Sequence, residues 1–266
     1  ITKKDLRSVN DVLTRGMIAR GSATSNFEKK VADFSEAKFG FAVSSGSSAI
    51  ILALKCLGVS SGDGVVLPTY VCRGVLEAVY TVGCIPELCD VNEFGVIDVN
   101  TVSNVISKKT KAIIAVHIFG NPCNIDELKA FGLPVIEDAC QALGLKTSNG
   151  IAGSRGAIGI LSFHATKCIT TGEGGMLLTN DPEISGAVNK LILGDEIPQA
   201  RFFSQFNDLQ ATLGLSQLGR YKDFEQRRRE IFSKYVERCD QLGLEVGNDP
   251  EGNLPYRFTI KSSKGL

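Results

Sequence analysis

Residues 161–175 read LSFHATKCITTGEGG, and this stretch does most to decide the fold. An apolar run leads into it, one lysine (Lys167) stands at its centre, and three glycines close it before a second apolar run. The pattern predicts strands at 158–163 and 175–179, joined by a loop that carries the lysine. Because burial disfavours the ammonium form, a lysine among small and apolar neighbours can supply the neutral amine that Schiff-base chemistry requires. The alternative is a lysine that merely extends to solvent.

The same alternation of short apolar runs and amphipathic stretches continues on both sides of this segment. It is typical of strands laid side by side and joined by helical crossovers, so the fold class is α/β. Further strands are expected at 41–44, 65–67, 85–89, 112–117 and 134–137, and helices at 47–57, 71–82, 101–107 and 125–131. After residue 181 the pattern becomes helical, and the charged segment 217–241 indicates a solvated helix face. A last strand is expected at 256–260.

Composition excludes several classes of function. The 266 residues are 43% hydrophobic, and 29 Lys and Arg balance 29 Asp and Glu, so there is no basic field to hold nucleic acid or an anionic membrane. The first residues lack the apolar core of a signal peptide and no segment is long enough to span a bilayer, so we expect a cytoplasmic protein. The eight cysteines are scattered without metal-ligand spacing and are expected to be reduced and buried, with no metal site.

Two more strand ends carry residues suited to a ligand. Residues 43–49, VSSGSSA, run from a strand through a small-residue turn into a helix whose free N–H groups would suit a phosphate. Residues 135–141, VIEDACQ, end a strand with two acids at the edge where parallel sheets bind ligands. The plainer alternatives are a turn capped by serine in the first case and a helix capped by Asp138 in the second.

A histidine at a further strand end, His117, is expected to be structural. With two histidines in the chain and no serine or cysteine elbow nearby, a hydrolytic triad is not expected. A dinucleotide-dependent oxidoreductase is also disfavoured, because no GxGxxG follows the first strand. The phosphate cradle, the acid and the lysine together match the three partners that pyridoxal phosphate needs for its phosphate, its ring nitrogen and its aldehyde.

These motifs, in this order, resemble the DegT/DnrJ/StrS family of sugar aminotransferases, which share the aspartate-aminotransferase-like fold (type I) of pyridoxal-phosphate enzymes. The likeness covers residues about 27–217 and is carried by FEKKVADF, AVSSGSSAIILALKCLG, GDGVVLPTYV, KAIIAVHIFGNP, VIEDACQALG, SFHATKCITTGEGGMLLTND and LQATLGLSQL. The resemblance implies a mainly parallel central sheet with helices on both faces. It implies a large cofactor-binding domain at 1–244, including an N-terminal helix, and the start of a small C-terminal α+β domain at 245–266 that we expect to be incomplete.

The resemblance also assigns roles to residues of this chain. Lys167 would form the Schiff base with the cofactor and later move a proton between the cofactor carbon and the sugar carbon. Asp138 would pair with the pyridine nitrogen and Gln141 would lie by the ring hydroxyl. The phosphate would be held by Gly46, Ser47 and Ser162.

Two positions depart from the family pattern. The position of the family's aromatic residue that stacks on the cofactor ring falls on Cys72, and the nearest aromatic residue is Tyr70, so either is expected to cover the ring. An asparagine that reaches the phosphate of the neighbouring subunit in the family is matched here by Phe203.

The activity implied by the resemblance is transfer of an amino group, from glutamate, to a nucleotide-linked keto-sugar, in amino-sugar and polysaccharide biosynthesis. The implied partners are therefore a small amino donor and a nucleotide-sugar acceptor, and the implied assembly is a homodimer with active sites at the subunit interface. Two alternatives remain. Sugar dehydratases share this fold but carry histidine in place of the lysine, and a non-catalytic protein could keep the fold without the reaction.

Overall fold

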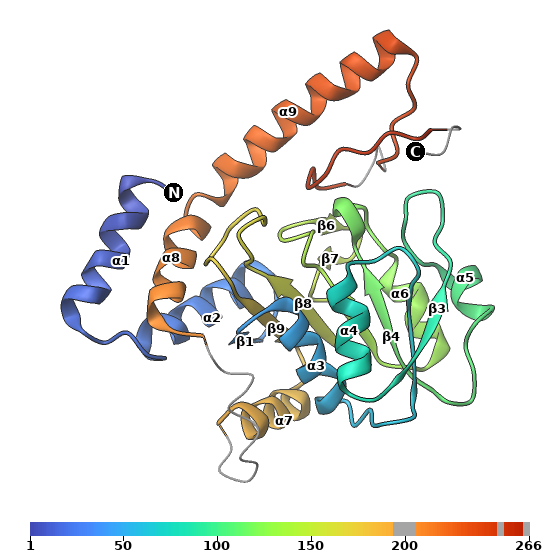
Figure 1. Cartoon of the computed structure of the whole chain (residues 1–266), viewed down its shortest axis with the longest axis horizontal. Coiled ribbons are helices and arrows are strands. Elements are labelled where there is room, and N and C mark those ends of the chain that lie inside the picture. Colours follow the sequence, from blue (N-terminus) through green and yellow to red (C-terminus); the bar gives the residue numbers. More distant parts are fainter. Residues whose placement is uncertain (194–205, 249–252, 263–266) are drawn as a thin grey trace.

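The computed structural model describes residues 1–193, 206–248 and 253–262. Its centre is a seven-stranded sheet in the order β1-β9-β8-β5-β4-β2-β3 (Figure 1). The strands are β1 (Phe39–Val43), β2 (Gly64–Pro68), β3 (Ile85–Cys89), β4 (Thr110–Val116), β5 (Val135–Asp138), β8 (Ile158–Ser162) and β9 (Gly175–Thr179). In this sheet β9 pairs antiparallel with both of its neighbours, and every other pair is parallel. The expected α/β class and mainly parallel sheet are confirmed.

Helices precede, connect and follow the strands along the chain. They are α1 (Lys3–Arg15), α2 (Ser22–Phe34), α3 (Gly46–Cys56), α4 (Arg73–Thr81), α5 (Val99–Ser103), α6 (Ile125–Leu128), α7 (Pro182–Leu193), α8 (Asp208–Leu218) and α9 (Tyr221–Leu242), with the short turns η1 (Ile118–Gly120) and η2 (Lys129–Phe131) and the hairpin β6 (Lys146–Thr147) and β7 (Gly150–Ile151). The helix expected at 101–107 is shifted to α5, because the Asp98 carboxylate accepts hydrogen bonds from the N–H groups of Asn100 and Thr101 and starts the helix earlier.

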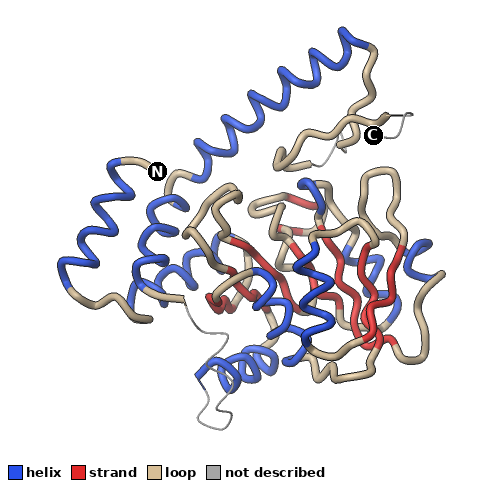
Figure 2. Tube along the Cα trace, viewed as in Figure 1, coloured by secondary structure: helices blue, strands red, loops and turns tan. Residues whose placement is uncertain are grey.

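Helices cover both faces of the sheet, as Figure 2 shows by colour. Side chains alternate along β1, so Phe41 and Val43 enter one hydrophobic core and Ala42 enters the other. The first core includes side chains of α3 and α7, and the second includes side chains of α2 and α8. The two cores fix the sheet edge from which the site residues project.

Helix α9 extends away from the sheet, and residues 253–262 return beside it (Figure 1). Phe258 packs against Phe232 and Tyr235 of α9, with ring centroids 5.2 Å apart in each pair. The strand expected at 256–260 is wrong, because only Ile260 pairs there, in an isolated bridge with Val246. Packing against α9 and separate hydrogen bonds, such as the one from the Leu254 N–H to the Gly120 carbonyl oxygen at 3.0 Å, hold this segment without a ladder. The second domain expected from residue 245 stays a prediction.

The cysteines agree with expectation in part. All eight carry free thiols. Cys84, Cys89, Cys123 and Cys239 are buried, but Cys72 is exposed, so the expectation of burial is wrong there. The helices described here include none that is both long and apolar enough to cross a membrane.

Candidate active site

A cavity of about 360 Å³ lies where the carboxyl end of β5, the end of β8 and the start of α3 meet. Seven of the eight site residues expected from the sequence line it: Gly46, Ser47, Cys72, Asp138, Gln141, Ser162 and Lys167. The eighth, Tyr70, does not. Its side chain is 56% exposed and packs edge-on against Phe119, with ring centroids 5.8 Å apart. In this structure Cys72, not Tyr70, faces the cavity.

The start of α3 forms an open cradle on one side of the cavity. Ser45 caps the helix, its hydroxyl accepting a hydrogen bond from the Ser48 N–H at 3.0 Å, so the capping alternative holds as well. The N–H groups of the first helical residues have no partner within the helix. A Cβ on Gly46 would lie 3.0 Å from the Cys140 sulfur and 3.3 Å from the Ser162 Cβ, so only glycine keeps this approach open. The cradle therefore combines free N–H groups with the hydroxyls of Ser47 and Ser162.

Asp138 ends β5 and is 4% exposed. Its Oδ1 accepts a hydrogen bond from the Cys140 N–H at 2.9 Å, and turns rather than a helix follow, so a helix-capping role is wrong. Burial, assisted by the neighbouring Asp138 charge, raises the pKa of the Cys140 thiol, which stays protonated. Gln141 is fixed by a hydrogen bond from the Phe119 N–H to its Oε1 at 2.9 Å.

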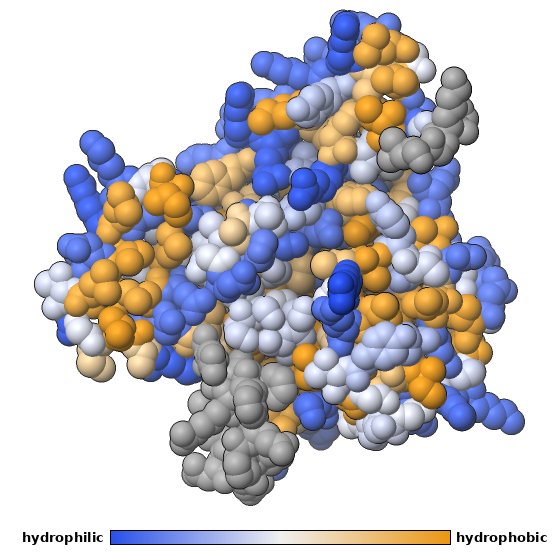
Figure 3. All heavy atoms as spheres, viewed as in Figure 1, coloured by the Kyte–Doolittle hydropathy of each residue, from blue (hydrophilic) through white to orange (hydrophobic). Residues whose placement is uncertain are grey.

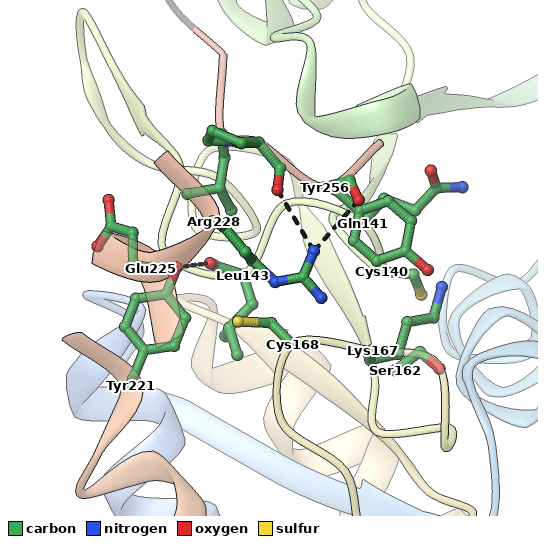
Figure 4. A pocket seen from close by; sticks show the side chains of 12 residues that line it. Cys140, Gln141, Leu143, Ser162, Lys167, Cys168, Tyr221, Glu225, Arg228 and Tyr256 are labelled. Carbon is green, nitrogen blue, oxygen red and sulfur yellow. Dashed lines mark hydrogen bonds between the residues drawn. The ribbon is translucent and has the colours of Figure 1, made fainter. Parts of the chain in front are cut away.

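Lys167 lies in the loop after β8 and is half-buried, so it does not extend freely to solvent. Its amine faces the ring of Tyr256, 5.1 Å from the centroid (Figure 4). The loop is closed by a hydrogen bond from the Thr171 N–H to the Phe163 carbonyl oxygen. At its end, Gly175 meets the Ser45 carbonyl so closely that a Cβ would lie 2.2 Å from that oxygen. The glycines noted in the sequence thus let the lysine loop and the α3 cradle adjoin.

Sequence reasoning missed Arg228 and Tyr256, which line a narrow cavity beside Lys167. Figure 4 shows the three side chains turned toward one another. Arg228 donates to the carbonyl oxygens of Pro255 (3.4 Å) and Tyr256 (3.2 Å), and its guanidinium lies 5.8 Å from the Tyr256 ring centroid. The sequence could have signalled Arg228, because it falls on the apolar stripe that Phe224 and Phe232 form at four-residue spacing.

The two arginines beside Arg228 behave as expected for a solvated face. The exposed side chains of Arg227 and Arg229 pair with Glu230 and with the half-buried Glu225, respectively. Three further residues that sequence reasoning did not single out, His164, Thr166 and Glu173, line the larger cavity. Phe203 lies outside the described residues.

His117 is fully buried and does not line either cavity beside Lys167, in agreement with a structural role. Its Nε2 lies 2.9 Å from Oε1 of Glu137, which is also fully buried. No three His, Cys, Asp or Glu side chains gather into a possible metal site within the described ranges.

Pyridoxal phosphate fits the groups around the larger cavity. Its phosphate matches the α3 cradle, where a Cβ would close the space, and its ring nitrogen matches the buried carboxylate of Asp138. Its aldehyde matches the amine of Lys167, which lines the same cavity. The residues around this cavity therefore suit the phosphate, the ring nitrogen and the aldehyde of the cofactor.

Comparison with known proteins identifies the family of the chain. A model of the DegT/DnrJ/EryC1/StrS aminotransferase family matches residues 1–262. GDP-perosamine synthase of Escherichia coli O157:H7 is 34% identical, over 91% of this chain and 70% of that protein. The spore coat polysaccharide biosynthesis protein SpsC of Bacillus subtilis is 32% identical, over 91% of this chain and 68% of that protein. The solved aminotransferase TlmJ from Streptoalloteichus hindustanus matches with a TM-score of 0.89 at 29% identity, over 98% of this chain and 76% of that one.

The fold, the grouped residues and these relatives lead to one assignment. The chain belongs to the DegT/DnrJ/EryC1/StrS aminotransferase family and is an aminotransferase that depends on pyridoxal phosphate, as its sequence predicted.

Proposed function

We propose that this enzyme transfers an amino group from glutamate to a keto-sugar carried on a nucleotide, with Lys167 as its catalytic residue. The observation that carries the proposal is that the Lys167 amine, the buried Asp138 carboxylate and the α3 cradle line one cavity. Relatives named GDP-perosamine synthase and spore coat polysaccharide biosynthesis protein support an amino-sugar product.

Each residue then has one task. The cofactor supplies an aldehyde that condenses with amines and a ring that accepts an electron pair from a substrate carbon. Lys167 would hold the cofactor through its side-chain amine, and the same amine would move the proton at the α-carbon of the amino donor. Asp138 keeps the ring nitrogen protonated and Gln141 lies beside the ring hydroxyl. Gly46, Ser47 and Ser162 would bind the phosphate, and Cys72 would lie against the ring.

Arg228 offers a place for the charged ends of the substrates. Its guanidinium and the Lys167 amine lie against the same ring, that of Tyr256. Glutamate brings carboxylates to this site and a nucleotide-linked sugar brings phosphates, and a guanidinium binds both kinds of oxyanion. Because the two substrates occupy the site in turn, one cation can serve both.

The experiment is spectroscopic. The purified enzyme with pyridoxal phosphate should show an absorption band that borohydride bleaches, and Lys167→Ala should lose it, whereas the exposed Lys190→Ala should keep it. Glutamate should convert the band to that of the amine form of the cofactor. A protein that shows no such band, or a Lys167→Ala variant that keeps it, would overturn the proposal.

The acceptor is identified in the second half-reaction. Nucleotide-linked keto-sugars are added to the enzyme with the amine form of the cofactor. The correct acceptor regenerates the aldehyde form of the cofactor and itself gains an amino group. A sugar dehydratase would instead remove a hydroxyl from the sugar and leave it without nitrogen. The presence of Lys167, where dehydratases of this fold carry histidine, favours the aminotransferase.

We also propose that the enzyme is a homodimer and that it works in the cytoplasm. Apolar side chains gather over α1 (Figure 3), where Leu6 is 63% exposed and Leu13 54%, and Met17 just beyond the helix is 74% exposed. A patch of this kind supports contact with another subunit. Sedimentation should give twice the mass of one chain, and Leu6→Lys combined with Leu13→Lys should shift it toward the monomer. A fully active wild-type monomer would contradict the dimer.

A further inference from the structure

Behind the cofactor cavity, three N–H donors converge on the carboxylate of Glu137. Its Oε1 lies 2.9 Å from His117 Nε2, and its Oε2 accepts hydrogen bonds from the N–H groups of Arg155 and Gly156, each at 2.8 Å. Burial alone would raise the pKa of Glu137, but the His117 side chain and the backbone N–H groups hold it below its usual value. A carboxylate that meets only donors is best satisfied when ionised.

The same hydrogen bonds fix the tautomer of His117. Its Nδ1 accepts a hydrogen bond from the Cys123 N–H at 2.9 Å, so Nδ1 carries no proton. The ring proton therefore sits on Nε2 and is donated to Glu137. Both side chains are fully buried, and water cannot replace either partner.

This pair is joined to both residues that would contact the cofactor ring. Neighbouring side chains on a strand point to opposite faces, so Glu137 lies behind β5 while Asp138 faces the cavity. The backbone N–H of His117, directly after β4, donates to the backbone carbonyl oxygen of Asp138 at 3.0 Å. The bond from Cys123 to His117 closes the loop that contains Phe119, whose N–H holds Gln141.

We propose that His117 and Glu137 are a positioning pair that fixes Asp138 and Gln141 against the cofactor ring. The inference rests on the proposed function, because it assigns those two residues to the ring. A charged partner held even slightly out of place loses much of its effect, so buried supports of this kind set the strength of a site. Neither residue lines the cavity proposed for the cofactor.

Glu137→Gln tests the pair without changing its size. The amide has one acceptor oxygen, so in either orientation its NH₂ faces a donor: His117 on one side, or Arg155 and Gly156 on the other. We expect the folded variant to bind pyridoxal phosphate about tenfold more weakly than wild type, with a shifted absorption band. The matched control is Glu87→Gln, because Glu87 accepts from the hydroxyls of Ser107 and Thr110, which can rotate to suit an amide. That variant should bind the cofactor normally.

His117→Asn covers the case in which Glu137→Gln does not fold. The asparagine oxygen can still accept from the Cys123 N–H but cannot reach Glu137, so cofactor binding should again weaken. If a folded variant at either position binds the cofactor with wild-type affinity and an unchanged band, the positioning role is overturned.

Nitrogen NMR of the imidazoles tests the pair in the protein without cofactor. The chain has two histidines, and His164→Gln leaves His117 as the single signal. We expect the Nε2–H tautomer, and the Nδ1–H tautomer would overturn the pair. A wild-type protein that binds no pyridoxal phosphate would contradict the proposed function, while this NMR result would still decide whether the pair exists.

Discussion

At the scale of single residues, Asp138 is a position where the charge of a side chain can be removed while its size and shape are kept. Asp138→Asn keeps an oxygen that can accept the hydrogen bond from the Cys140 N–H, so the turn after β5 should survive. The neutral amide cannot keep the cofactor ring nitrogen protonated. We expect the half-reaction with glutamate to slow by roughly 100-fold or more, with the melting temperature nearly unchanged. Stopped-flow absorbance measures the rate, and Asp63→Asn on a distant turn is the control. A rate close to wild type would show that Asp138 is not the ring partner.

Arg228 is a second residue whose effect can be isolated. Arg228→Met keeps much of the side chain's apolar stem but removes the guanidinium beside Lys167. The KM for glutamate should rise by about tenfold, because a charge-assisted hydrogen bond to the substrate is lost. The matched control is Arg238→Met on the same helix, where the exposed side chain donates a hydrogen bond to Oε1 of Gln241 at 2.9 Å. Equal KM values for glutamate in the two variants would show that Arg228 does not bind the substrate.

At the scale of elements, the sequence predicts the sheet better than the helical C-terminal part. Seven of the eight expected strands exist, and those at 85–89 and 175–179 have the expected bounds. Buried parallel strands are short apolar runs, and this signal is local. The position of Tyr256 beside Lys167 depends instead on contacts between α9 and residues 253–262, which no local pattern contains. The motifs also predicted seven residues that line one cavity, whereas the finding that Cys72 rather than Tyr70 faces this cavity depends on the direction in which α4 begins.

Helix α3 gives the prediction at this scale. Gly46→Ala should add a Cβ that meets the Cys140 sulfur at 3.0 Å and the Ser162 Cβ at 3.3 Å, which narrows the phosphate cradle. We expect cofactor binding to weaken by about tenfold while the helix itself remains, since alanine favours helix. Equilibrium dialysis measures the affinity. Gly186→Ala in α7, where a Cβ would meet nothing within 4 Å, should bind cofactor normally and raise the free energy of unfolding by up to about 1 kcal/mol. An unchanged affinity of Gly46→Ala for the cofactor would show that the phosphate does not bind at the start of α3.

At the scale of the whole molecule, buried carboxylates join the N-terminal helices to a helix about 200 residues later. Asp208 at the start of α8 accepts hydrogen bonds from the N–H groups of Gly21 and Thr24 at 2.8 and 2.9 Å. Asp5 of α1 accepts from the Ser216 hydroxyl at 2.7 Å and pairs with Arg220. These contacts hold α1 and α2 against α8, and α2 and α8 both contribute side chains to the second core. The packing of that core therefore depends on the negative charges of Asp5 and Asp208.

A fall in pH should therefore weaken the contact between α1 and α8. Burial alone would raise the pKa of Asp5, but hydrogen bonds from Ser216, Thr2 and Arg220 outweigh it and lower the pKa from 3.8 to about 2. A pKa that is lower in the folded state means that the ionised carboxylate stabilises the fold, by about 2 kcal/mol here. That contribution is complete above pH 3.8 and is lost as the pH falls through about 2. Asp5→Asn should thus lower the free energy of unfolding in urea at pH 7 by about 2 kcal/mol, and the difference from wild type should shrink toward pH 2. Exposed Asp11→Asn on the same helix should follow wild type throughout, and a constant difference for Asp5→Asn at every pH would show that its charge does not hold α1 in place.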